Sequence, residues 1–340
     1  MMNFYNKIKS NLNHIIITII LVIFTVMSLT GTIGRSDTVL LEKVAIAIIL
    51  ATSLGMVVGF LGELSLGHAG FMCIGAYVGG KLASVLEPTL GNSLPTLLIT
   101  LVVGGLCAAA FGMIIGLPAL RLRGDYLAIV TLAFGEIVRT VVMNLPEGLF
   151  GGTLGLKTPR FDNKYLFIVA FILVLICIAT IQNLLRSKHG RAISSIRDNE
   201  IAARAMGIDV TKYKLLVFTI SSFFAGIAGV LYSYTQSRVQ SASFSYNYSI
   251  EILVMVVLGG LGSINGSIIA AALITFLNVK LQTQLTGDLA VLQNLVYAVI
   301  LILIVIYNNA PALKTFREKN NIKALLARRK AAKKNKKEDA

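Results

Sequence analysis

The stretch RSKHGRAISSIRDNEIAARAMGIDVTKYK, residues 186–214, is the longest polar interruption between the hydrophobic segments of this 340-residue chain. It carries seven basic and three acidic residues, which gives it a net charge of +4. A short loop with this excess of Lys and Arg between apolar segments stays in the cytoplasm. The flanking segments are therefore predicted to cross a membrane, and this loop sets their orientation.

A short helix is predicted inside this loop, over the sequence IAARAM, residues 201–206. Asp198 or Asn199 can cap its N-terminus, where Glu200 lies near the positive end of the helix dipole. Arg204 lies toward the negative end, and Gly207 is expected to end the helix.

The predicted helix has a narrow apolar face at helical spacing, made mostly of small residues: Ile201, Ala202, Ala205 and Ile208. Such a face is typical of a helix that lies in a groove of another protein. The alternative interpretation is an ordinary amphipathic helix on a basic cytoplasmic loop.

The composition is that of a membrane protein that crosses the bilayer many times. Hydrophobic residues make up 56% of the chain, charged residues 14%, and the mean hydropathy is +0.79, whereas about a quarter of the residues of a soluble domain are charged. The net charge of +15 could indicate nucleic acid binding. However, the basic residues concentrate in the loop 186–214 and in the C-terminal tail rather than beside aromatic stacking residues, so the charge reports topology. No nucleic acid partner is expected.

Ten crossings are predicted, or eight if both glycine-rich segments described below re-enter, with both termini in the cytoplasm. The clearest spans are residues 14–33, 39–60, 95–117, 166–185, 213–236 and 289–307. External loops are expected around Arg35, Asp37, Glu42 and Lys43, at residues 144–164 and at residues 237–250. A permease domain at 1–313 is followed by a tail, 314–340, which is expected to be cytoplasmic, disordered and attracted to anionic lipid. The cysteines Cys73, Cys107 and Cys177 lie in apolar runs without metal-type spacing, which predicts reduced, buried thiols.

The first glycine-rich segment is GFLGELSLGHAGFMCIGAYVGG, residues 59–80, where an uninterrupted apolar helix would be expected. Irregular backbone and ionisable groups survive at membrane depth only if they face protein or a water-lined path. Glu63 and His68 could line such a path, or they could pair with each other across a helix break. The GxxxG spacings at Gly55/Gly59, Gly75/Gly79 and Gly112/Gly116 favour close packing of helices.

A second glycine-rich segment, residues 259–267, interrupts the apolar runs 251–261 and 268–281. The sequences VVGFLGELSLGHAG from Val57 and VVLGGLGSINGSII from Val256 share paired valines that lead into a glycine-rich break. Paired, interrupted segments in two halves point to a translocation path at a repeat interface. The predicted path residues are Glu63, Ser65, Gly67, His68, Gly70, Gly259, Gly260 and Gly262.

Glu136 and Arg139 lie three residues apart on one face of the helix predicted within residues 118–139. An ion pair between them would lower the cost of burying both charges, and this favours a structural role over contact with a substrate. Arg121 and Arg123 place the start of this helix in the cytoplasm.

Three stretches resemble known transporter subunits. Ala202 and Ala203, followed after three intervening residues by Gly207, resemble the EAA loop through which permeases of ABC importers contact their ATPase, although the family acid falls on Ile201 and no Leu-Pro follows. GELSLGHAGF (62–71) and LRLRGDYLAIVTLAFGEIVR (120–139) resemble LivM-type permeases of branched-chain amino acid importers, as does nearly the whole chain. The resemblance implies ATPase-coupling residues at Arg197, Glu200, Ile201, Ala202, Ala203, Ala205 and Gly207.

The resemblance also implies a bacterial cytoplasmic membrane location and several partners: a LivH-type second permease, two ATPases and an extracellular binding protein for leucine, isoleucine or valine. The sequence has no GxxxxGK[ST] P-loop, so ATP would be bound by a partner, and no cofactor or metal is expected in this chain. Permeases for simple sugars, urea or other amino acids are alternatives. A secondary carrier would leave the docking helix unexplained, and an enzyme would need paired carboxylates or a nucleophile with a base, which are not seen.

Overall fold

The computed structural model describes residues 34–284, except Arg123 and Asp162, together with five isolated positions, Thr25, Ala298, Val299, Ile302 and Ile306. Two compact units are distinguished, Met1–Phe276 and Leu277–Ala340. The predicted spans 14–33 and 289–307 lie outside the described residues apart from those isolated positions. The predicted tail 314–340 lies outside them completely.

Seven helices in the described part of the chain are long and apolar enough to cross a membrane. Helix α3 (Arg35–Gly55) continues into a π-helical turn, η1 (Met56–Leu61). The other six are α4 (His68–Leu90), α5 (Leu94–Ala119), α6 (Asp125–Asn144), α8 (Asn163–Arg186), α11 (Val210–Thr235) and α13 (Ile264–Gln284). Helix α12 (Tyr246–Gly259) is shorter and also apolar. The chain is thus a mostly helical, multi-pass membrane protein.

Helix α11 packs against α3, α4 and α5, and α3 also packs against α8. Glycine makes the closest of these approaches possible, because a Cβ on Gly75 would collide with the backbone of Gly226, and one on Gly229 would collide with the carbonyl oxygen of Met72. Without a hydrophobic driving force between helices in lipid, such close packing is a main source of their association. The Gly75/Gly79 spacing therefore serves helix packing.

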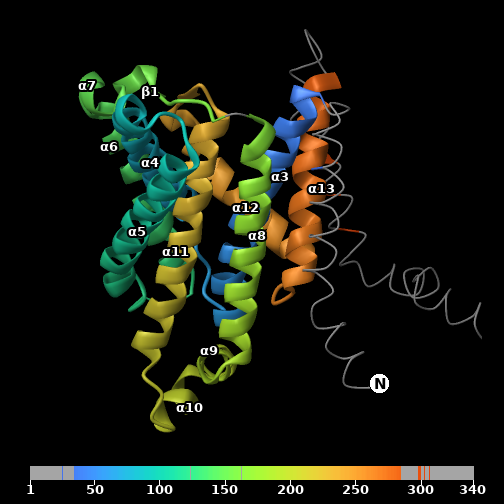
Figure 1. Cartoon of the computed structure of the whole chain (residues 1–340). Coiled ribbons are helices and arrows are strands. Elements are labelled where there is room, and N and C mark those ends of the chain that lie inside the picture. The colour runs from blue at the N-terminus through green and yellow to red at the C-terminus, as the bar shows by residue number, and fades with distance from the viewer. Residues whose placement is uncertain are drawn as a thin grey trace, which may run out of the picture. The chain divides into compact units, whose positions relative to one another are not determined.

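The two ends of this bundle carry different structures, and Figure 1 shows them far apart. At one end lie two short helices, α9 (Lys188–Asp198) and α10 (Glu200–Ala205). At the other end lie α7 (Glu147–Phe150), η2 (Gly152–Leu154), β1 (Leu156–Lys157), β2 (Arg238–Val239) and η3 (Ser241–Phe244). Strands β1 and β2 pair antiparallel, with Leu156 opposite Val239. The pairing joins two predicted external loops.

The prediction of an external loop through Lys43 is wrong, because α3 already begins at Arg35. Four charged residues within nine positions suggested a loop, but they do not all face water. Glu42 is only 1% exposed, so it lies on the buried side of α3 and not in a loop.

The nonhelical part of each glycine-rich segment is shorter than predicted. Helix α4 runs without interruption from His68, so the first break comprises only Gly62–Gly67. Helix α13 begins at Ile264, so the second break comprises only Gly260–Ser263. The remaining glycines permit close packing instead of ending helices. We call these two segments the first and second breaks.

The three cysteines of the described residues are free thiols. Cys73 and Cys177 are buried as expected, whereas Cys107 is only partly buried. The expectation of burial is therefore wrong for Cys107, which lies on α5.

Candidate functional site

The second break packs directly against η1, the turn of helix that leads into the first break. A Cβ on Gly59 of η1 would collide with the backbone nitrogen of Gly262, and Gly55 lies beside the side chains of Val256 and Ser267. Gly62 and Gly262 both have a φ of 80°, which glycine adopts without strain. The two segments that share a sequence pattern therefore meet in space.

Side chains from other helices bind the backbone around the first break. The backbone N–H of Leu66 donates to Thr131 Oγ1 of α6 at 3.0 Å, and that of Ala69 donates to Ser249 Oγ of α12 at 3.1 Å. Gly67 and Gly70 lie tightly against Thr131 and Gly135 of α6. Nonhelical backbone at membrane depth needs such partners, so these contacts anchor residues 66–70, at the α4 side of the break, to α6 and α12.

His68 and Glu63 do not pair with each other, and that interpretation of the sequence is wrong. His68 Nε2 shares a hydrogen bond of 2.8 Å with Ser53 Oγ of α3, and His68 is 2% exposed. Glu63 lies before the start of α4, and its carboxylate binds Lys214 of α11 instead. The chain turn at the break therefore sends the two side chains to different helices.

Lys214 joins the first break to the loop 186–214. Its ammonium group forms a short contact with Glu63 Oε1 and donates to Glu200 Oε2 at 3.1 Å. Its side chain is only 3% exposed, whereas those of Glu63 and Glu200 are 13% and 23% exposed. A buried ammonium group requires close partners, and here two carboxylates supply them. Glu200 also accepts from Arg204 Nη2 at 2.8 Å.

In the sequence, Lys214 is recognisable only as one charge of the basic loop. A helical pattern could have identified it, because Lys214 lies on the same stripe of α11 as the buried residues Val210, Val217 and Ser221. A lysine on such a stripe needs a partner on the neighbouring element.

Arg197 of α9 also reaches the breaks. Its Nη1 donates to the carbonyl oxygen of Gly59 at 3.4 Å, and its side chain lies against Gly62. Gly262 of the second break is close to the same guanidinium group. Arg197 Nη2 also lies 3.1 Å from Asp198 Oδ1. The loop 186–214 therefore contacts both breaks through basic side chains of α9 and α11.

Helix α10 begins one residue before the predicted start and has the predicted type of cap. Asn199 Oδ1 accepts from the backbone N–H of Ala202 at 3.0 Å, and Gly207 follows the helix with a φ of 81°. Helix α9, which precedes it and is capped by Ser187, was not predicted.

The outward side of α10 is apolar and exposed. Ile201 is 75% exposed and Met206 is 82% exposed, whereas Ala203 is buried at 4%. Ala203 therefore belongs to the inward side, and Ile208 is half-buried. We define the outer face of α10 as Ile201, Ala202, Ala205 and Met206, all of them exposed. The predicted apolar face did not include Met206, which lies just beyond the last residue of α10.

The predicted path residues occupy three different environments. Ser65 is 1% exposed, and its hydroxyl has no hydrogen-bond partner among the described residues. Glu63 lies with the loop 186–214, as described above. The others are held by neighbouring parts of the bundle: Gly67, Gly70 and Gly259 lie against backbone, His68 bonds to Ser53, and Gly260 and Gly262 belong to the second break.

Glu136 and Arg139 lie as their spacing predicts, with Arg139 Nη2 2.8 Å from Glu136 Oε2. Both side chains are partly exposed, at 27% and 29%. Glu136 Oε1 also accepts from the backbone N–H of Tyr246, the first residue of α12, at 2.8 Å. The pair therefore fixes the start of α12.

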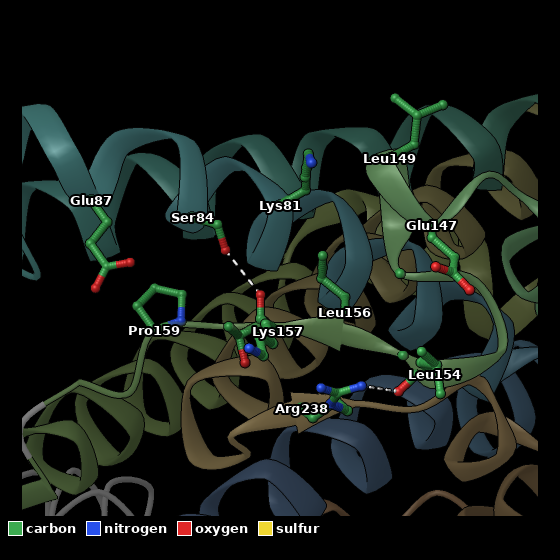
Figure 2. Close-up of a pocket in the computed structure, with 13 residues that line it drawn as sticks. Lys81, Ser84, Glu87, Glu147, Leu149, Leu154, Leu156, Lys157, Pro159 and Arg238 are labelled. Atoms are coloured by element: carbon green, nitrogen blue, oxygen red, sulfur yellow. Dashed lines mark hydrogen bonds between the residues drawn. The ribbon is translucent and has the colours of Figure 1, made fainter.

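A cavity of about 610 Å³ lies at the end of the bundle that carries α7 and β1. Figure 2 shows its walls, which come from the last turns of α4, from residues 147–159 and from β2. Charged side chains of both signs line it: Lys81, Glu87, Glu147, Lys157 and Arg238. Arg238 Nη1 donates to the carbonyl oxygen of Leu154 at 2.8 Å, and Ser84 Oγ donates to that of Lys157 at 3.0 Å. These residues are too scattered in the sequence to have been predicted as one site.

The family described as branched-chain amino acid transport system / permease component matches residues 37–306. The high-affinity branched-chain amino acid transport system permease protein LivM of Salmonella typhimurium is 38% identical over 273 residues, 71% of this chain and 63% of the relative. LivM of Escherichia coli K12 is 40% identical over 260 residues, 67% of this chain and 60% of the relative. The match therefore spans less than two thirds of either LivM protein.

A more distant similarity extends to a permease with a different named substrate. The ribose import permease protein RbsC of Escherichia coli K12 is 27% identical over 295 residues, 79% of this chain and 84% of the relative. No solved structure matches this chain.

Proposed function

This chain belongs to the family of branched-chain amino acid transport permease components, and from that premise we propose that it is a transmembrane permease subunit of an ATP-driven importer. Its substrates are leucine, isoleucine and valine. The exposed outer face of α10, at the end of the bundle that carries the basic loop, is the observation that carries the proposal. An exposed isoleucine on this six-residue helix and an exposed methionine directly after it suit a groove on a partner protein.

We propose three kinds of protein partner for this subunit. Two ATPase subunits bind and hydrolyse ATP, and one of them docks on the outer face of α10. A LivH-type permease completes the membrane part of the importer. The complex lies in the cytoplasmic membrane of a bacterium with α9, α10 and both chain termini in the cytoplasm, since the loop 186–214 has a net charge of +4.

The cavity at the opposite end meets the extracellular binding protein that delivers the amino acid. Its charged residues include the cations Lys81, Lys157 and Arg238 and the anions Glu87 and Glu147. Surfaces with both signs of charge favour one orientation of a complementary partner and discriminate against others. The cavity also lies far from α10, so the two partners bind without competing for one surface.

The translocation path runs beside the two breaks, where backbone and a few polar side chains replace continuous helix. A zwitterionic amino acid must lose water to cross, so the path needs scattered polar groups, of which Ser65 is one. Binding that is too tight would trap the substrate, as it would trap an ion in a channel. This subunit alone therefore has no high-affinity site for leucine.

Reconstitution into liposomes tests the function. The chain is assembled with the second permease, the ATPases and leucine-loaded binding protein, and uptake of labelled leucine is measured with and without ATP. ATP-dependent uptake that isoleucine and valine compete away, but ribose and urea do not, is the expected result. Uptake that requires an ion gradient and no ATPase would instead identify a secondary carrier and contradict the proposal.

A further inference from the structure

A continuous series of polar contacts leads from α10 to the first break. Glu200 is the first residue of α10, Lys214 lies in the second turn of α11, and Glu63 directly follows Gly62. Lys214 donates to both carboxylates. One buried ammonium group therefore connects the helix that carries the outer face to the nonhelical backbone of the break.

Few other contacts attach α10 to the bundle. In the described part of the chain, its substantial contacts are with α9 and α11, and Ala203 is its one buried residue. An alanine side chain offers little area through which a force could be transmitted. The ion pair between Glu200 and Lys214 joins α10 to α11 directly.

The first break is able to respond to a displacement of Glu63. Residues 62–67 are outside any helix, and Gly62, directly before Glu63, has no Cβ to restrict its dihedral angles. Small changes at such positions can move the segments on either side, as they do in hinges. The second break would follow, because Gly262 lies against Gly59 with no side chain between them.

We propose that Lys214 is a positioning residue that transmits movement of α10 to the first break through the two carboxylates it bridges. This inference rests on the proposed function, which makes α10 the docking site of the ATPase. Lys214 touches neither substrate nor ATP. It holds Glu63 and Glu200 at a fixed separation, so that rotation or translation of α10 changes the backbone of residues 62–67.

The variants are chosen to separate transmission from stability. Lys214→Met removes the ammonium group that faces the two carboxylates. Glu200 keeps Arg204 as a partner, but Glu63 loses its contact with Lys214, which by itself destabilises the fold. The double variant Glu63→Gln/Lys214→Met removes one of these charges as well and serves if the single variant unfolds. Lys214→Arg keeps a cation at the same position. Lys212→Met is the matched control, since Lys212 is exposed two residues earlier on the same helix.

The first measurement is leucine uptake per ATP hydrolysed by the complete importer in liposomes. The Lys214→Met variant and the double variant should lower this ratio by about ten-fold, within the range by which residues on a coupling route act. Capture of the ATPase should be unchanged, Lys214→Arg should keep most of the ratio, and Lys212→Met should match wild type. A wild-type ratio in a folded double variant would overturn the inference.

The second measurement does not depend on the substrate. Amide hydrogen exchange over residues 59–67 is compared before and after the ATPase binds with a nonhydrolysable ATP analogue. Exchange should change several-fold in wild type and stay constant in the double variant, and an equal change in both would overturn the role of Lys214. If the wild-type complex shows this change but transports no branched-chain amino acid, the proposed substrate is wrong and the link stands. Failure of wild type to capture the ATPase would overturn the proposed function and the inference built on it.

Discussion

Glycine at position 59 allows the second break to touch η1, the turn that leads into the first break, because any side chain there would occupy the space of the Gly262 backbone. Other close approaches in the bundle are made between complete helices, as at Gly75 and Gly226. At Gly59, however, the neighbour is a turn with its own left-handed glycine. The absence of a Cβ at position 59 thus decides whether η1 and the second break can pack against each other.

Gly59→Ala should therefore lower the thermal stability of the purified subunit and reduce transport. Overpacking of this kind costs about 1–3 kcal/mol, and the backbone of Gly262 cannot move aside as a side chain could. Gly148→Ala is the control, since a Cβ at that position would meet nothing within 4 Å. An unchanged melting temperature for Gly59→Ala, measured in the same detergent, would show that η1 and the second break are not in close contact.

The different partners of Glu63 and His68 give a second test at this scale. Replacing Glu63 by Gln and His68 by Ala should affect stability additively, within about 0.5 kcal/mol, because separate sites behave so. The cycle that combines Glu63→Gln with Lys214→Met should be strongly nonadditive, since those residues bind each other. The unfolding free energies of the three single variants and the two double variants, each compared with wild type, provide the measurement.

At the scale of elements, helix α10 combines a well-defined local structure with weak attachment to the bundle. Its cap on Asn199 and its end at Gly207 depend on neighbours in the sequence, and so the helix could be predicted from the sequence alone. Its exposed apolar side chains have no use in the isolated subunit. Such side chains suit the docking of a partner, as proposed for the ATPase.

Ile201→Ser and Met206→Ser should each weaken capture of the ATPase by about ten-fold or more, as loss of a large apolar anchor at an interface does. The helix itself should persist, because neither residue caps it. Leu90→Ser is a suitable control, since Leu90 is also an exposed large apolar residue but lies at the end of α4. Wild-type affinity in both outer-face variants, measured with purified ATPase, would rule out docking at this helix.

The elements whose signals are local were predictable, and those that depend on distant partners were not. The long apolar helices and the Glu136–Arg139 pair follow from spacing within one segment. Nothing near Glu63 in the sequence reveals Lys214, 151 positions away, so the nearby His68 looked like its partner. The pairing of β1 with β2 and the charged cavity likewise arise only when separate loops come together.

At the scale of the whole molecule, the two ends of the described bundle are proposed to lie on opposite sides of the membrane. Helices α9 and α10 lie at one end, and α7 and β1 lie at the other. The basic loop predicts that the first end is cytoplasmic. The proposed ATPases and the proposed binding protein then lie on opposite sides of the membrane.

Single cysteines test this orientation once Cys73, Cys107 and Cys177 have been replaced by alanine. A cysteine at Lys188 should resist a membrane-impermeant thiol reagent in intact cells, and one at Thr153 should react, because both positions are exposed but lie at opposite ends. Permeabilised cells provide the control, since both sites should then be labelled. Labelling of position 188 from outside would invert the topology.

The exposure of Met206 gives the outer face of α10 a chemical reporter of its own. Met206 is 82% exposed, so mild oxidants such as hydrogen peroxide can reach its sulfur. Conversion to the sulfoxide replaces a flexible apolar group with a polar one. Oxidised subunits should therefore bind the ATPase less well, and methionine sulfoxide reductase should restore binding. In the assembled complex the same sulfur should be shielded, so mass spectrometry of this one methionine would measure the fraction of subunits that are docked.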